Sequence, residues 1–92
     1  MKIITNAHVK KINFLNKIAE DVEFWQGNEL KKVKADKEII LSSGSIGSPQ
    51  ILQVSGIGNP KKLKDVGIEI IQELNGVGEN LHDHLMLRPI YK

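Results

Sequence analysis

The sequence contains no cysteine, so disulfides and thiol chemistry are excluded within its 92 residues. This composition fits a reducing compartment, and a cytoplasmic protein is the expectation. No apolar run approaches the roughly 20 residues of a membrane-spanning helix. The first residues, Met1 to Thr5, turn polar too soon for a signal peptide. The sequence therefore predicts no membrane span.

A strong charge bias is also missing, and aromatic residues are few. Thirteen basic and eleven acidic side chains leave a net charge of +2. That balance does not indicate nucleic-acid binding, and the lysines are not set among aromatic residues. The length predicts one small domain, near the lower limit for a stable single core. The aromatic residues are interpreted as contacts within the core or with a neighbouring domain: Phe14, Phe24, Trp25 and Tyr91.

Residues 8–35 predict an antiparallel β-meander. Three short stretches rich in β-branched and aromatic residues are separated by two turn signals, Asn16-Lys17 and residues 26–29. Such stretches alternate apolar and polar residues, as expected for strands with one solvated face.

Residues 36–58 predict a strand, a glycine-containing loop and a helix. Ile39 to Leu41 is expected to be a strand buried on both faces, because its apolar residues do not alternate with polar ones. Ser48 and Pro49 predict the start of the helix, since serine caps free N–H groups and proline fits the first helical position. Gly56 predicts the end of the helix.

The loop from Ser43 to Pro49 is the first place to expect a ligand, because ligands lie at the carboxyl ends of parallel strands. Gly44 and Gly47 permit positive φ and a close approach of ligand to backbone. From the residues alone, an ordinary turn between a strand and a helix is the more frequent explanation of such a loop.

Residues 59–84 predict a short helix, a strand and a polar loop. Asn59 is a favourable N-cap, Pro60 fits the first helical position, and Gly67 predicts the helix end. Ile68 to Leu74 is expected to be a strand, and residues 85–91 the beginning of another.

Two motifs near the end of the chain suggest a dinucleotide-binding loop and a zinc site, but the surrounding residues do not support either. Residues 76–81 fail as a dinucleotide-binding fingerprint, because the sixth position is Leu81 rather than glycine. In an extended segment His82 and His84 point to one side, as two zinc ligands would. They lack a third ligand, and His8 lies far away in the sequence. A solvated or hydrogen-bonded pair is therefore favoured, and no metal site is predicted.

Two stretches together carry a family resemblance: EIILSSGSIGSPQILQVSGIG (residues 38–58) and LKDVGIEIIQELNGVGENLHDHL (residues 63–85). In this order and spacing they resemble the interior of glucose–methanol–choline (GMC) oxidoreductases, and choline-dehydrogenase-like members in particular. The resemblance implies an FAD enzyme that oxidises the CH–OH group of alcohols. Residues 1–92 would then be one partial domain of α/β class, an antiparallel β-meander followed by a βαβ-like unit, from the interior of a Rossmann-like FAD-binding domain.

The resemblance also implies roles for individual residues. It places Val9 where its backbone meets the adenine ring of FAD, and it makes Asn80 and Asp83 braces of a loop beside the cofactor cleft. The loop that approaches the cofactor would contribute Ser43, Gly44, Ser48 and Pro49. The family's glycine fingerprint and its proton-abstracting histidine have no match here, so no catalytic residue is expected.

The isolated chain is accordingly expected to be inactive. The implied partners are FAD, a small alcohol substrate in the full-length enzyme, and the missing parts of the same enzyme. The alternative is a stand-alone small α/β protein, or a truncated remnant, that binds a partner and catalyses nothing.

Overall fold

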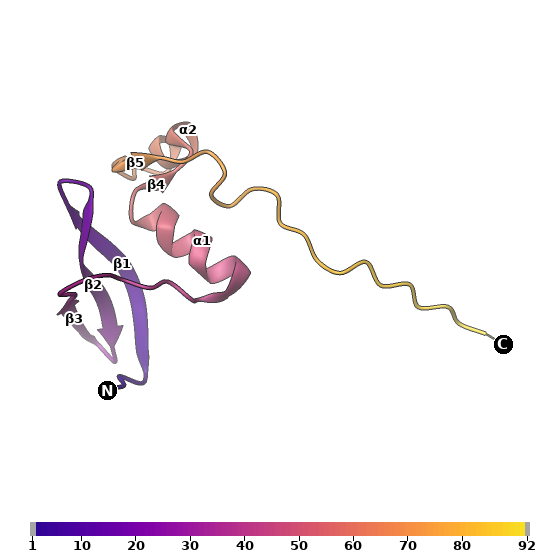
Figure 1. Cartoon of the computed structure of the whole chain (residues 1–92), viewed down its shortest axis with the longest axis horizontal. Coiled ribbons are helices and arrows are strands. Elements are labelled where there is room, and N and C mark those ends of the chain that lie inside the picture. The colour runs from indigo at the N-terminus through magenta and orange to yellow at the C-terminus, as the bar shows by residue number, and fades with distance from the viewer. Residues whose placement is uncertain (1, 92) are drawn as a thin grey trace.

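The computed structural model describes residues 2–91, which form a three-stranded sheet, two helices and a two-stranded sheet (Figure 1). In these residues no helix is long and apolar enough to cross a lipid bilayer. The arrangement confirms the α/β fold class. In chain order the elements are β1 (Ala7–Leu15), β2 (Ile18–Gln26), β3 (Glu29–Lys34), α1 (Gly44–Val54), β4 (Ile57–Gly58), α2 (Pro60–Asp65) and β5 (Gln72–Glu73).

The first sheet is the predicted antiparallel meander, with strand order β1-β2-β3. Both turns form where the sequence places them. Asn16 and Lys17 have φ values of 50° and 66°, and Gly27 has a φ of 61°. Positive φ at a two-residue hairpin turn matches the right-handed twist of the flanking strands, which is why Asn and Gly are favoured there.

A small parallel unit follows α1, in which β4, α2 and β5 form a βαβ connection. The predicted caps of α2 are confirmed. The Asn59 side chain accepts hydrogen bonds from the backbone N–H groups of Lys61 and Lys62 at 3.1 and 3.2 Å. Gly67, which follows the capping residue Val66, has a φ of 74°. The strand expected over residues 68–74 is reduced to β5, since only this part pairs with β4.

The predicted start of the first helix is wrong. Pro49 lies inside α1, which begins four residues before Ser48, at Gly44. Proline's fixed φ suits a helix, but inside one it removes the hydrogen bond to the carbonyl four residues earlier and its ring crowds that carbonyl. The Ser48 Oγ instead accepts a hydrogen bond from the backbone N–H of Ser43 at 2.9 Å. Most of the expected loop is therefore the first half of α1.

The strands predicted at 39–41 and 85–91 are also absent from the described residues. Ile40 is 78% exposed, and residues 85–91 are extended and exposed. A parallel strand with two apolar faces requires strands beside it and helices on both sides, and the described residues supply none at Ile39 to Leu41. Figure 1 shows the C-terminal segment projecting away from the sheets.

The buried core is small. Its apolar members are Ile12 of β1, Phe24 of β2, Leu63 of α2 and Val77. Ser55 and Glu23 are buried with them. α1 lies between the antiparallel sheet and the parallel unit (Figure 1), so it is the element through which these two parts are connected.

Candidate functional site

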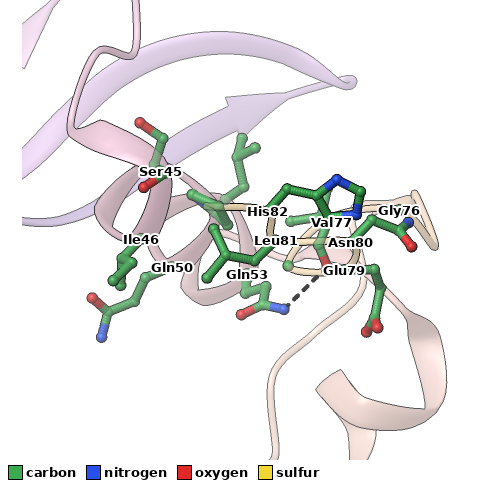
Figure 2. A pocket seen from close by; sticks show the side chains of 14 residues that line it. Ser45, Ile46, Gln50, Gln53, Gly76, Val77, Glu79, Asn80, Leu81 and His82 are labelled. Carbon is green, nitrogen blue, oxygen red and sulfur yellow. Dashed lines mark hydrogen bonds between the residues drawn. The ribbon is translucent and has the colours of Figure 1, made fainter. Parts of the chain in front are cut away.

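Two pockets lie on different sides of α1 and share one lining residue, Gln50. We call the first the loop pocket, because residues 76–82 form its second wall. It encloses about 650 Å³. From α1 it is lined by Ser45, Ile46, Ser48, Pro49, Gln50, Leu52 and Gln53. Figure 2 shows Leu81 and His82 beside this helix.

The wall opposite α1 is held by contacts to both helices. Gln53 Nε2 donates a hydrogen bond to the Val77 carbonyl at 3.3 Å (Figure 2), and Lys62 of α2 forms an ion pair with Glu79. Gly78 has a φ of 78°, and a Cβ at this position would lie 2.7 Å from Gln53 Nε2. The positive φ favours glycine here, and a side chain at this position would displace the Gln53 amide.

The second pocket, which we call the sheet pocket, lies between α1 and the strands β1 and β2. It encloses about 500 Å³. Trp25 is 39% exposed and lines this pocket, with Lys10 Nζ 6.0 Å from its ring centroid. The lining residues are Ala7, His8, Val9, Lys10, Trp25, Ser43, Gly47, Gln50, Ile51 and Val54.

A network of charges fixes Lys10 at the edge of the sheet pocket. Glu23, which is 7% exposed, forms ion pairs with Lys32 at 3.0 Å and with Lys10 at 3.4 Å. Asn13 Nδ2 donates a further hydrogen bond to Glu23 at 3.1 Å. The hydrogen bonds from Lys32 and Asn13 lower the pKa of Glu23 from 4.5 to about 2. The hydrogen bond between Lys32 and Glu23 also raises the pKa of Lys32. Glu23 is therefore ionised at neutral pH and restrains the Lys10 ammonium group.

The structure divides the predicted cofactor residues between the two pockets. Val9 and Ser43 lie together in the sheet pocket, although 34 positions separate them. Ser48, Pro49 and Asn80 line the loop pocket.

Gly44 and Asp83 line neither pocket. Gly44 has a φ of 83°, and a Cβ there would meet no atom within 4 Å. Backbone conformation, rather than contact with another part of the chain, therefore explains the glycine. Gly47, which could also have adopted positive φ, lies within α1 without it. The Asp83 carboxylate accepts a hydrogen bond from the backbone N–H of His84 at 2.7 Å.

The sequence did not identify several pocket residues. Gln50 and Gln53 follow the predicted helix start, and three-residue spacing was the only indication that they lie on similar sides of α1. Trp25, which was interpreted as a contact within the core or with a neighbouring domain, is 39% exposed and lines the sheet pocket, so it is not part of the buried core of the described residues. His82 lines the loop pocket, and residues 2–91 contain no group of three side chains suited to hold a metal ion.

Comparison with known proteins gives consistent results. The family model for GMC oxidoreductases matches residues 1–86. The oxygen-dependent choline dehydrogenase of Pseudomonas fluorescens is 46% identical over 89 residues, which cover 95% of this chain and 16% of that protein. The corresponding protein of Cronobacter sakazakii is 48% identical over 87 residues, covering 92% of this chain and 16% of its own length.

A solved structure is also similar. An FAD-dependent oxidoreductase from Chaetomium thermophilum superimposes with a TM-score of 0.84 at 45% identity, and the match covers 88% of this chain and 14% of that one. The chain thus spans about a sixth of the length of the curated relatives it matches.

Proposed function

Because this chain belongs to the GMC oxidoreductase family, we propose that it forms part of the FAD-binding domain of an enzyme that oxidises alcohols. One observation carries the proposal. α1 separates two pockets that share Gln50, and each pocket contains residues that the family resemblance assigns to the cofactor. A dinucleotide cofactor is long enough to occupy two neighbouring sites in succession, whereas a compact ligand would fill only one of them.

The residues present fit part of FAD. The first half of α1 contains two glycines and two serines beside Ile46, and Gly47 lets a ligand in the sheet pocket approach the helix backbone closely. The loop pocket offers the hydroxyl and amide groups of Ser48, Gln53 and Asn80, which suit the hydroxyl groups of a ribityl or ribose chain. The sheet pocket adds the positive charge of Lys10 and the aromatic ring of Trp25.

The predicted site residues then take distinct roles. Val9 and Ser43 hold the adenine end in the sheet pocket, while Ser48, Pro49 and Asn80 line the path of the remaining cofactor. Gly44 makes the turn into α1 possible through its positive φ. Asp83 braces the segment after Asn80 through its hydrogen bond to the His84 backbone.

The chemistry of the reaction comes from the cofactor, since bound FAD accepts a hydride from the alcohol carbon. This chain contributes binding and orientation of the cofactor and no group that removes the hydroxyl proton. The proposal accordingly treats residues 1–92 as one partial domain: the meander at 8–35, the segment carrying α1 at 36–58, and the parallel unit with its loop at 59–84. Its partners would be FAD, a small alcohol and the other parts of the enzyme, in the cytoplasm.

A chimeric enzyme tests this proposal. The matching segment of the P. fluorescens choline dehydrogenase is replaced by this chain, and flavin absorbance per protein and choline-dependent dye reduction are measured. Retention of FAD is expected. A chimera that folds but contains no FAD would refute the proposal.

Matched variants of the chimera locate the cofactor. Gly47→Leu adds a side chain to the lining of the sheet pocket, where its Cβ lies 3.2 Å from the Ser43 Cβ. Leucine is a better helix former than glycine, so a fall in bound FAD would come from the changed sheet pocket, through the added side chain and the displacement of Ser43, rather than from loss of the helix. Val66→Leu, at a position 69% exposed, is the control and should leave the FAD content unchanged. Full FAD content in Gly47→Leu would contradict the placement of the cofactor in the sheet pocket.

A further inference from the structure

Ser55 is a buried hydroxyl that connects α1 to the antiparallel sheet. It directly follows α1 and is 6% exposed. Its Oγ accepts a hydrogen bond from the backbone N–H of Ile12 at 2.8 Å and donates one to the Ile51 carbonyl at 2.6 Å. Both hydrogen-bonding functions of the hydroxyl are therefore used, one toward the strand and one toward the helix.

In the sheet, the hydrogen-bond partner of Ser55 is the Ile12 amide, on the side of β1 that faces away from β2. β1 is an edge strand, because the strand order is β1-β2-β3. The Ile12 N–H points to Ser55 and takes no part in the ladder with β2. Within residues 2–91 this is the one hydrogen bond between the sheet and α1 with its capping residue. A buried backbone amide without a partner is costly, so this contact strongly favours one position of the helix along β1.

The surroundings of Ser55 do not otherwise fix this position. A pocket of about 370 Å³ lies against Ile12, Val54 and Ser55, so apolar packing between the helix end and the strand is incomplete. Ile51 and Val54, at the same end of α1, line the sheet pocket together with Trp25. A shift of this helix end would therefore change the shape of the sheet pocket.

We propose that Ser55 is a positioning residue that fixes α1 against β1 and thereby shapes the sheet pocket for the adenine end of the cofactor. The identity of that ligand rests on the proposed function, whereas the tie between helix and strand does not. Ser55 itself does not line the sheet pocket, so it acts through the position of α1.

Three variants separate positioning from general stability. Ser55→Ala removes the hydroxyl. Ser55→Thr keeps it, and the adjacent 370 Å³ pocket has room for the added methyl group. Leu63→Ala removes a side chain that is 3% exposed on α2, away from the contact between Ile12 and Ser55, and serves as the control for loss of stability.

Two measurements on the 92-residue chain test the tie directly. In Ser55→Ala, amide hydrogen exchange at Ile12 should accelerate about tenfold or more, and the emission of Trp25, the only tryptophan, should shift to longer wavelength as water enters the sheet pocket. Ser55→Thr should behave like the parent chain. Unchanged exchange at Ile12 in Ser55→Ala, or the same local acceleration in Leu63→Ala, would overturn the proposal.

The chimera tests the consequence for the cofactor. The FAD dissociation constant should rise about tenfold in Ser55→Ala and should stay near the parent value in Ser55→Thr. In Leu63→Ala it should change less than in Ser55→Ala, even where both variants lower the melting temperature by a similar amount. An unchanged dissociation constant in Ser55→Ala would overturn the positioning role. If the parent chimera holds no FAD, the proposed function fails. Amide hydrogen exchange at Ile12 then still tests whether Ser55 fixes α1 against β1.

Discussion

Replacement of Gly56 by alanine should destabilise the chain more than the same replacement at any helix end without a close neighbour. Gly56 follows α1 with a φ of 89°, and a Cβ there would lie 2.5 Å from the Glu69 carbonyl oxygen and 2.8 Å from Ile71 Cγ1. The Gly56 carbonyl also accepts hydrogen bonds from the N–H groups of Ile71 and Gln72 at 2.8 and 3.2 Å. A shift that relieves the overlap would therefore disturb the start of the β4–β5 pairing.

The magnitude has two parts. Positive φ costs a residue with a Cβ about 1–2 kcal/mol, and forcing an additional carbon into a packed position costs typically another 1–3 kcal/mol. We therefore expect Gly56→Ala to lower the free energy of unfolding by about 2–5 kcal/mol. Gly67 is the matched control. It follows α2 with a φ of 74°, but a Cβ there would meet no atom within 4 Å, so Gly67→Ala should show only the backbone part.

Urea unfolding followed by Trp25 fluorescence provides the assay, because the chain contains a single tryptophan. Equal losses of stability in Gly56→Ala and Gly67→Ala would refute the reasoning, since the close approach of Glu69 and Ile71 would then have no energetic consequence.

Two further predictions concern charge and metal binding. Because the pKa of Glu23 falls from 4.5 to about 2 on folding, its contribution to stability is fully present above pH 4.5 and is lost as the pH falls toward 2. The urea midpoint of the parent chain should decrease over this range, and the midpoint of Glu23→Gln should decrease less. Equal decreases in the parent and in Glu23→Gln would contradict the pairing of Glu23 with Lys32 and Asn13. Zinc should neither bind tightly nor raise the melting temperature, because His82 and His84 lack a third ligand, and a sub-micromolar site by calorimetry that His84→Ala abolishes would reverse this assignment.

Short-range signals in the sequence predicted the local structure well. Asn16, Asn59 and Gly67 act through their own backbone conformation or through groups two or three residues away. Their effect therefore depends little on the remaining fold, and the turns and caps form where the residues place them.

Long-range features were predicted less well, for an identifiable reason. The strand at Ile39 to Leu41 depends on neighbouring strands, and its apolar sequence does not reveal whether they are present. The start of α1 is the exception among the short-range signals, because Pro49 is acceptable both at the first position of a helix and, at some cost, inside one. The extended residues 85–91 show the same dependence on a partner strand.

The candidate site depends both on local sequence and on contacts between distant parts of the chain. The family resemblance selected Val9 and Ser43, but only the packing of α1 on β1 places them in one pocket. Trp25 and Ser55 carry no sequence motif of their own for these roles. Their importance comes from the partners that the fold brings to them, Lys10 in one case and Ile12 in the other.

The central claim is that this chain supplies one part of an FAD site and requires other parts of the enzyme to hold the cofactor. The direct measurement uses the 92-residue chain with excess FAD, passed through a desalting column, followed by the flavin spectrum and alcohol-dependent dye reduction. We predict no retained flavin and no turnover, because no glycine fingerprint binds the pyrophosphate and no residue matches the family's proton-abstracting histidine. Stoichiometric retained FAD would contradict the claim with or without turnover of an alcohol; without turnover it would show that the two pockets beside α1 suffice to bind the cofactor.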